Sequence, residues 1–527
     1  MTPSYNVLAF NSRRSPVFAR RGLIATAHPL ASAAGLRILQ DGGNAIDAAV
    51  AAAAVLGVVE PYQTGLGGDA FALIYLARER RVRALNASGP APQAATLESY
   101  RARGLTEIPR RSALAWTVPG CVDGWAAMLE AHGRRTLAHV LAPAIEYAEQ
   151  GFPVAPGDAV SWQASEAVLA QDAEAARTLL VDGRAPRAGD VVVQHDLART
   201  LRLVAEGGRD AFYEGEVAKR LVAYARDAGG LLSRDDLAAY RAEWVEPIEA
   251  EYKGYRVLEC PPNGQGLAAL IALRALRDVD LAADPRDSAA CLHRLIEAVK
   301  QGMVQAARHV ADPRFADVPV ATLLRDARPP SGYTASVPDA EAWGRSDTVY
   351  LAVVDHDGNA VSFINSVYDD FGSGHVARGL GFVMQNRGAG FSLDPAHPNR
   401  LEPGKRPFHT IIPAMLLRGD ALHTVLGVSG GFMQPQGHAQ LVASLVDYGL
   451  DVQSAVDMPR FWWEEGRRVA VEEGVPQSTC ATLASWGHDI VRRGHRGMGG
   501  AQIIQALPKG VWVAGSEPRQ DGCAIGH

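Results

Sequence analysis

The chain has 527 residues, of which 47% are hydrophobic and 21% are charged, and its formal net charge is −6. These values are typical of a soluble globular protein, and the acidic balance argues against a nucleic-acid-binding protein, which needs a clustered basic face. The longest uncharged apolar run covers residues 48–59, whereas a membrane-spanning helix needs about 20 residues, so no membrane contact is expected.

The cysteines indicate the compartment. Five cysteines are scattered along the chain without a CxxC spacing, and an odd, sparse set does not form a disulfide framework. The N-terminus has no apolar segment ahead of its first charges, so no secretory signal is predicted. We therefore expect a cytoplasmic protein.

The N-terminal part predicts a strand, two helices and a second strand. Residues 23–27 form a short apolar run, and residues 31–40 a small-residue helix that ends at the glycines after Asp41. Asn44 is a helix N-cap with Asp47 in the first turn, and residues 48–59 are apolar on all sides, which predicts a buried helix. The glycine-rich loop of residues 64–69 leads into a strand over residues 70–76 and not into a helix, so a phosphate-binding loop is not favoured.

Two later segments frame the middle of the chain. Residues 255–258 predict a strand that ends in a Pro/Gly-rich corner at residues 261–266, ahead of an apolar helix. Residues 329–339 are rich in Pro, Gly and Ser and read as a linker.

The stretch 347–368 predicts a hairpin buried on both faces. Two apolar runs are joined by Asp357-Gly358, which is a strong signal for a tight turn. A turn centred on this pair would place Val367 opposite Thr348, with Ser366 and Tyr368 on either side of it. Two hydroxyl groups would then lie beside a threonine at a strand start, although a plain buried hairpin has the same periodicity.

A second candidate nucleophile lies further along. Residues 427–431 fit the G-x-S-x-G nucleophile elbow of serine hydrolases around Ser429, after a strand-like run and before a helix-like run. Acidic and histidine residues follow in the order that these enzymes use. Five-residue patterns often match by chance, and this one leaves the rest of the chain unexplained, so it is kept as an alternative.

Several of these motifs resemble the gamma-glutamyltransferase family of N-terminal-nucleophile hydrolases. The similarity lies in Asp347-Thr348, in residues 353–362 and in residues 371–374, and it extends over nearly the whole chain. It implies an α+β fold, a four-layer αββα sandwich. It also implies self-cleavage between Asp347 and Thr348, which would give a large subunit of residues 1–347 and a small subunit of residues 348–527 that stay together as a heterodimer, with a dimer of heterodimers left open.

The resemblance also assigns roles to residues of the expected site. The freed Thr348 would be the nucleophile and its own α-amine the general base, with Ser366 as the hydroxyl of the second strand. The backbone N–H groups of Gly430 and Gly431 would form the oxyanion hole.

The expected substrate pocket departs from the pattern of the glutathione-cleaving members. Arg387 stands in place of a glutamine, Gly390 in place of the aspartate that holds the glutamyl ammonium, and Tyr368 in place of an asparagine. His409-Thr410 replaces a pair of serines, and Leu97 replaces an arginine, for which Arg101 is a possible substitute one helical turn away.

These changes remove partners of an amino-acid head group. They resemble the branch with oxamate amidohydrolase and cephalosporin-acylase-like members. We therefore expect an amidohydrolase that acts on a small carboxylate-bearing amide, with Tyr368, Arg387, His409 and Thr410 in contact with the substrate. A true glutathione hydrolase is the alternative, and an inactive binding protein is disfavoured because the nucleophile and the glycine pair are both present. No metal and no organic cofactor are implied, since the histidines lack paired ligand spacing.

Overall fold

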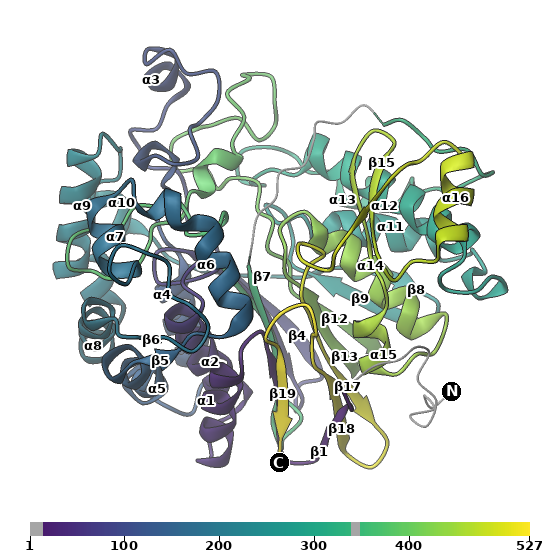
Figure 1. The fold of residues 1–527 in the computed structure, drawn as a ribbon, viewed down its shortest axis with the longest axis horizontal. Coiled ribbons are helices and arrows are strands. Elements are labelled where there is room, and N and C mark those ends of the chain that lie inside the picture. The colour runs from purple at the N-terminus through teal and green to yellow at the C-terminus, as the bar shows by residue number, and fades with distance from the viewer. Residues whose placement is uncertain (1–13, 339–347) are drawn as a thin grey trace.

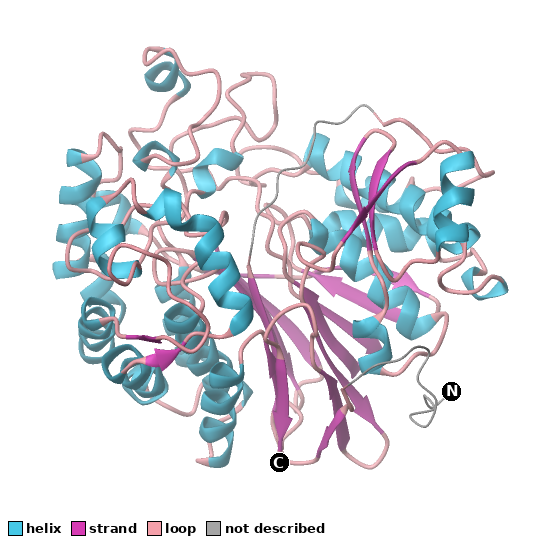
Figure 2. Cartoon of the chain, viewed as in Figure 1, coloured by secondary structure: helices cyan, strands magenta, loops and turns pink. Residues whose placement is uncertain are grey.

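The computed structural model describes residues 14–338 and 348–527. Two seven-stranded antiparallel sheets lie face to face, and helices cover the outer face of each (Figure 1). Figure 2 shows the strands between the two groups of helices. This arrangement is the expected four-layer αββα sandwich, and the fold prediction is confirmed.

The first sheet contains the candidate nucleophile strand at its centre. Its strand order is β19-β2-β10-β11-β3-β4-β7. The bounds are β19 Cys523–Gly526, β2 Leu23–Thr26, β10 Val349–Val354, β11 Ala360–Ser366, β3 Asp69–Leu76, β4 Arg81–Ala87 and β7 Glu243–Val245. This sheet contains strands from before and after residue 347, with β2 between β19 and β10 and β3 next to β11, so the two halves of the chain cannot separate without breaking its hydrogen bonds.

The second sheet has the order β1-β18-β17-β13-β12-β9-β8. The bounds are β1 Val17–Ala19, β18 Val511–Gly515, β17 Ala501–Leu507, β13 Ala421–Val428, β12 Ala414–Arg418, β9 Tyr255–Glu259 and β8 Ile248–Tyr252. Two small sheets complete the strands: β14 Phe461–Glu465, β15 Arg468–Glu472 and β16 Asp489–Arg493, and β5 Phe152–Pro153 with β6 Val191–Val192.

Helices form the two outer layers. On the first sheet lie α1 Pro29–Gln40, α2 Ala45–Val59, α4 Cys121–His132, α5 Leu137–Gln150 and α8 His195–Tyr213, and on the second α11 Gly266–Leu276, α12 Ala289–His309, α14 Met433–Val446 and α15 Val452–Asp457 (Figure 1). The others are α3 Leu97–Arg101, α6 Pro156–Leu169, α7 Ala173–Leu179, α9 Glu216–Asp227, α10 Arg234–Ala239, α13 Val320–Arg325 and α16 Gln477–Ser485.

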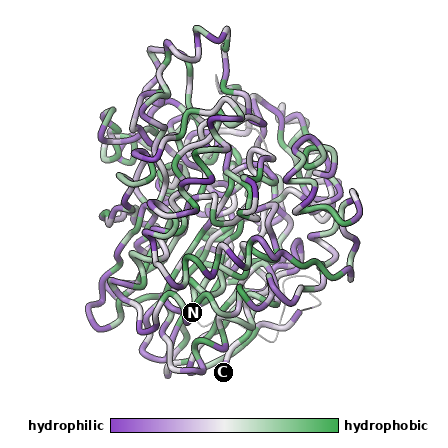
Figure 3. Tube along the Cα trace, turned by 90° about the vertical axis from the view of Figure 1, so that its left-hand side faces the viewer, coloured by the Kyte–Doolittle hydropathy of each residue, from purple (hydrophilic) through white to green (hydrophobic). Residues whose placement is uncertain are grey.

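The predicted buried helix and its cap are confirmed. Every residue of α2 is buried, and Asn44 and Asp47 form a reciprocal capping box at its start. Such a cap satisfies two backbone donors that the first turn leaves free. The hydropathy trace in Figure 3 shows apolar stretches running through the interior.

Strand β10 is buried on both faces, as predicted. Val349, Leu351 and Val353 belong to the cluster under the first helical layer. Tyr350 and Ala352 belong to the cluster between the two sheets. The strand therefore crosses the centre of the molecule and holds its first residues deep inside.

The predicted hairpin register was wrong by one residue. Val349 pairs with Asn365 and Val354 with Ala360, so Thr348 extends the register to a position opposite Ser366, not Val367. The loop has three residues between Asp355 and Asn359, and Gly358 has a φ of +83°. A three-residue loop with a left-handed glycine is a common hairpin turn, and its extra residue shifts the pairing.

None of the helices in the described ranges is both long and apolar enough to cross a lipid bilayer.

Candidate active site

The candidate nucleophile lies in the buried interior at the start of β10. The Thr348 hydroxyl donates a hydrogen bond of 3.2 Å to the Ser366 hydroxyl, and both residues have no exposed surface. Asp347, the residue expected before the cleaved bond, is outside the described residues. The structure thus brings together the threonine and the second-strand hydroxyl that the sequence proposed as partners.

Ser366 is the hub of the site. Its oxygen also accepts from the Tyr368 N–H at 2.9 Å and from Arg387 Nη2 at 3.1 Å. Arg387 Nη1 donates to the Thr410 hydroxyl at 2.8 Å, and the guanidinium carbon lies 4.1 Å from the centre of the Tyr368 ring. Three predicted site residues, Ser366, Tyr368 and Thr410, therefore contact the guanidinium group of a fourth, Arg387.

Arg387 is fully buried, and its Nε is among the polar atoms without a partner in the described residues. Burial lowers its pKa to about 10, opposed by the nearby Tyr368 hydroxyl and by Asp69. The group remains a cation at neutral pH. A buried cation with a spare N–H favours an anionic ligand.

His409 faces a buried carboxylate at the start of β3. His409 Nε2 lies 3.0 Å from Asp69 Oδ2, and His409 Nδ1 accepts from the Ile411 N–H at 3.3 Å. The ring is therefore neutral, with its proton on Nε2, where it donates to Asp69. Burial lowers the pKa of His409 well below its ordinary value, and the charge of Arg387 lowers it further.

Asp69 holds three other donors through its second oxygen. The N–H groups of Gly89 and Gly120 lie at 3.1 and 3.0 Å, and the amide of Gln385 lies at 2.9 Å. Burial raises the pKa of Asp69 to about 7, although the charge of Arg387 lowers it. Sequence reasoning assigned no role to Asp69; its signal was an acidic residue at the end of the glycine-rich loop.

The expected oxyanion donors lie directly after β13. Gly430 and Gly431 have φ values of +100° and +57°, a region that other residues adopt only with strain. Gln265 donates to the carbonyl groups of Gly431 at 2.9 Å and Thr410 at 2.6 Å, which ties this loop to the segment that carries Thr410. Neither glycine N–H has an acceptor among the described residues.

Ser429 is held as an acceptor. Its hydroxyl oxygen accepts from the Gly500 N–H at 3.0 Å and from the Gln520 amide at 3.1 Å. Of the acids and histidines that follow it, Asp447 pairs with Lys253 and His488 bonds to His293, so neither serves as its base.

A cavity of about 460 Å³ adjoins the oxyanion loop. Gly430, Ser429 and Trp462 form part of its wall, and Asp370 and Arg111 also line it. Thr348 is buried and is not part of this wall. The cavity therefore borders the loop of the expected oxyanion donors.

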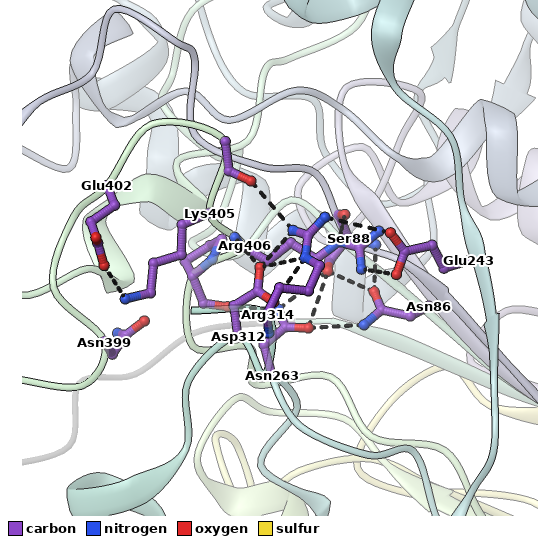
Figure 4. Close-up of polar contacts among 12 residues, drawn as sticks. Asn86, Ser88, Glu243, Asn263, Asp312, Arg314, Asn399, Glu402, Lys405 and Arg406 are labelled. Carbon is purple, nitrogen blue, oxygen red and sulfur yellow. Dashed lines mark hydrogen bonds and ion pairs between the residues drawn. The ribbon is translucent and has the colours of Figure 1, made fainter. Parts of the chain in front are cut away.

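The loop that carries His409 and Thr410 is fixed by an ionic cluster (Figure 4). The Arg406 guanidinium donates to Glu243 at 2.7 Å and to the Ser88 carbonyl at 3.0 Å. The backbone N–H of Arg406 donates to Asp312 at 2.8 Å. Asn263 donates to the Pro407 carbonyl at 2.7 Å. All four partners of the loop come from before residue 347, so the cluster joins the two expected subunits.

Arg101, considered as a substitute for the missing arginine, does not join the site. It lies on the short helix α3, is exposed, and donates to the Leu393 carbonyl at 3.3 Å. Arg387, and not Arg101, donates a hydrogen bond to the Ser366 hydroxyl next to Thr348.

Known proteins resemble this chain over nearly its full length. The sequence profile described as Gamma-glutamyltranspeptidase matches residues 31–527. The Glutathione hydrolase-like YwrD proenzyme of Bacillus subtilis is 40% identical, covering 97% of this chain and 99% of that protein. The Oxamate amidohydrolase proenzyme of Klebsiella pneumoniae is 38% identical, covering 96% and 98%.

A solved structure gives the same result for the fold. The crystal structure of cephalosporin acylase from Bacillus halodurans matches with a TM-score of 0.93 and 43% identity, covering 99% of this chain and 98% of that chain. The profile, the relatives and this structure agree on the branch that the sequence motifs indicated. The chain belongs to the gamma-glutamyltranspeptidase family of N-terminal-nucleophile hydrolases and transferases.

Proposed function

We propose that the protein is a self-processing amidohydrolase that cleaves small amides whose acyl group carries a carboxylate. The observation that supports this is the position of Arg387, because its guanidinium and the Thr348 hydroxyl share Ser366 as an acceptor. A carboxylate paired with Arg387 would lie close to the carbonyl that Thr348 attacks. This geometry requires a short acyl group, such as that of oxamate or of a dicarboxylic monoamide.

Maturation begins with the hydroxyl of Thr348. Its Oγ attacks the carbonyl carbon of Asp347, the C–N bond breaks, and the acyl group moves from nitrogen to oxygen. Water then hydrolyses the ester, which leaves the Asp347 carboxylate on residues 1–347 and a free α-amine on residues 348–527. Strands of both pieces are hydrogen-bonded to one another in the first sheet, which supports a lasting heterodimer.

The mature site then performs acyl transfer to water. The α-amine of Thr348 takes the hydroxyl proton while Oγ attacks the substrate amide carbon. The N–H groups of Gly430 and Gly431 stabilise the negative oxygen, a contribution of about 3–4 kcal/mol per donor. The protonated α-amine gives its proton to the leaving amine, and water hydrolyses the acyl-threonine ester.

The charges of the pocket disfavour a γ-glutamyl group. An α-ammonium close to Arg387 would meet a like charge, and the nearby carboxylates are already engaged: Asp69 by four donors and Asp369 by Arg110 and Asn386. A site with buried groups that the substrate leaves unpaired discriminates strongly between analogues. We therefore rank glutathione hydrolysis second.

The test is Arg387→Leu, assayed with matched anionic and neutral amides and a γ-glutamyl anilide. We expect kcat/KM for the anionic amides to fall by about 2–5 kcal/mol equivalents, as for one partner of a buried charge pair. Arg400→Leu, a half-exposed arginine paired with Glu402, is the control. An unchanged ratio of anionic to neutral hydrolysis in the matured variant would show that Arg387 is structural.

We further propose a cytoplasmic location and a reaction at Thr348 that needs no cofactor. The cysteines in the described ranges are all free thiols, which supports a reducing compartment. Association beyond the heterodimer stays a prediction, and light scattering of the matured protein would measure it.

A further inference from the structure

Two histidines and a glutamate meet in the second helical layer, away from Thr348. His293 and Glu297 are four residues apart and so lie on one face of α12, and His488 precedes β16. The candidate ligand atoms of these three residues all lie within 4.8 Å of one another. His293 Nδ1 is 2.8 Å from His488 Nε2. The two histidines are far apart in sequence, so spacing could not reveal them.

Both rings are buried and neutral. Burial lowers the pKa of His293, and burial with the charge of Lys300 lowers that of His488 to about 4. A backbone hydrogen bond with Gly332 opposes this lowering of the pKa of His293.

His488 has an unsatisfied nitrogen. Its Nδ1 is buried and has no hydrogen-bond partner in the described part of the chain. If His488 Nε2 carries the proton shared with His293, Nδ1 is a bare lone pair. Moving that proton to Nδ1 would free Nε2, so that the two facing nitrogens would present lone pairs to one point.

We propose that His293, Glu297 and His488 bind a divalent transition metal ion of the zinc type. Two imidazole nitrogens and one carboxylate suit Zn²⁺ or Co²⁺ better than Mg²⁺ or Ca²⁺, which prefer all-oxygen sites. A tetrahedral ion with metal–nitrogen bonds of about 2.0–2.1 Å needs the two nitrogens slightly further apart than they lie here. A neighbouring cavity of about 410 Å³, lined by Glu297 and Lys300, gives solvent access for a fourth ligand.

Lys300 limits the affinity. Its ammonium donates to Glu297 Oε1 at 2.7 Å and to the Ser336 carbonyl at 2.9 Å. The metal would therefore compete with a cation for the carboxylate, and binding should be reversible and weaker than in a structural zinc site. Removal of this charge should strengthen metal binding, so Lys300→Met should have the opposite effect to substitutions of the ligand residues.

The site lies where the two expected subunits meet. His293 and Glu297 precede the proposed cleavage point, and His488 follows it, so a bound ion would cross-link the two chains. The segment before the cleavage point is hydrogen-bonded beside the same site. The Ala335 N–H donates to the Trp486 carbonyl at 2.8 Å, and the Ser336 N–H donates to Glu297. The cross-linking role depends on the proposed function, whereas metal binding does not.

The test is Co²⁺ titration of metal-free protein, followed by visible absorption and calorimetry, in the uncleaved Thr348→Ala chain and in matured wild type. We expect one equivalent to bind in both. His293→Gln and His488→Gln should weaken binding by at least about 100-fold, and Lys300→Met should strengthen it several-fold. His423→Gln, a half-buried histidine on β13 bonded to Thr424, is the control and should change nothing.

Two results would overturn the proposal: no saturable Co²⁺ binding by folded wild type, or unchanged binding in the two glutamine variants with circular dichroism like that of wild type. Cross-linking is measured separately, as a Zn²⁺-dependent rise in the urea concentration at which the matured chains dissociate. If Zn²⁺ binds but leaves the urea concentration at which the matured chains dissociate unchanged, the ion does not cross-link the chains.

Discussion

Ser366→Ala tests whether the site is organised around one hydroxyl. The Ser366 oxygen accepts from Thr348, Arg387 and the Tyr368 N–H at 2.9–3.2 Å. Its loss removes the acceptor of a buried cation, where a charged hydrogen bond contributes about 1.5–3 kcal/mol, and leaves a buried N–H, which costs about 1–3 kcal/mol. We therefore expect a destabilisation of about 3–5 kcal/mol.

A second serine on the same strand is a matched control. Ser362 is also fully buried on β11, and its hydroxyl contacts the Tyr350 hydroxyl at 2.8 Å and donates to the Leu426 carbonyl at 3.3 Å. Both partners are neutral. Ser362→Ala should therefore cost about 1–2 kcal/mol, with the same change in volume as Ser366→Ala.

Both variants are compared by urea unfolding in the uncleaved Thr348→Ala chain, because a single chain avoids the concentration dependence of a heterodimer. Self-cleavage is timed separately with Thr348 present. Ser366→Ala should slow it by about tenfold or more, the value of one hydrogen bond that orients the nucleophile. Equal destabilisation by the two substitutions, or normal cleavage by Ser366→Ala, would refute the role of Ser366 as the hub.

Two further predictions concern the nucleophiles. Thr348→Ala should remain one band of 56.1 kDa on a denaturing gel, whereas wild type should give bands of roughly 37 and 19 kDa, the shares of residues 1–347 and 348–527; cleavage of the alanine variant would show that the junction is misplaced. Ser429→Ala should still mature and turn over substrate, because its hydroxyl only accepts hydrogen bonds from Gly500 and Gln520. Covalent capture of Ser429 by a fluorophosphonate would support a serine hydrolase instead.

The sequence predicted the elements whose cause is local. The capping residues at Asn44 and Asp47 and the apolar run that follows specify a buried helix without knowledge of its neighbours. The residues of β10 form an uninterrupted apolar run, which predicts that both faces of the strand pack against apolar clusters. The hairpin register failed because Asp-Gly is compatible with two- and three-residue loops, and local sequence does not select between them.

The chemical environment of the site depends on contacts that no local pattern encodes. Asp69 and His409 meet across 340 positions, and His293 and His488 across 195. The sequence identified Arg387 and His409 as unusual for the family. It could not show that the charge of Asp69 offsets that of Arg387, or that Asp69 accepts a hydrogen bond from His409 and so orients its ring. Such partners become visible only in the folded chain, where, for example, Asp69 at the start of β3 lies beside Ser366 at the end of β11.

The electrostatic interaction between Asp69 and Arg387 predicts how substrate binding depends on pH. Burial raises the pKa of Asp69 to about 7, so below that pH the carboxyl group is neutral and no longer offsets the charge of Arg387. Above it the carboxylate offsets the guanidinium charge, and KM for an anionic amide should rise. The same raised pKa stabilises the fold at low pH, and that stability is lost as the pH rises toward about 7.

The nucleophile responds to pH in the opposite direction. The α-amine of Thr348 must be neutral to act as a base, and α-amines ordinarily titrate near about 8, so kcat should rise with pH. Anionic amides should therefore show kcat/KM with a maximum, and neutral amides only the rising limb. Asp69→Asn fixes this position as uncharged and should abolish the rise in KM for anionic amides while leaving the kcat limb. If KM of wild type for an anionic amide stays constant from about pH 6 to 8, Asp69 does not control the charge of the pocket.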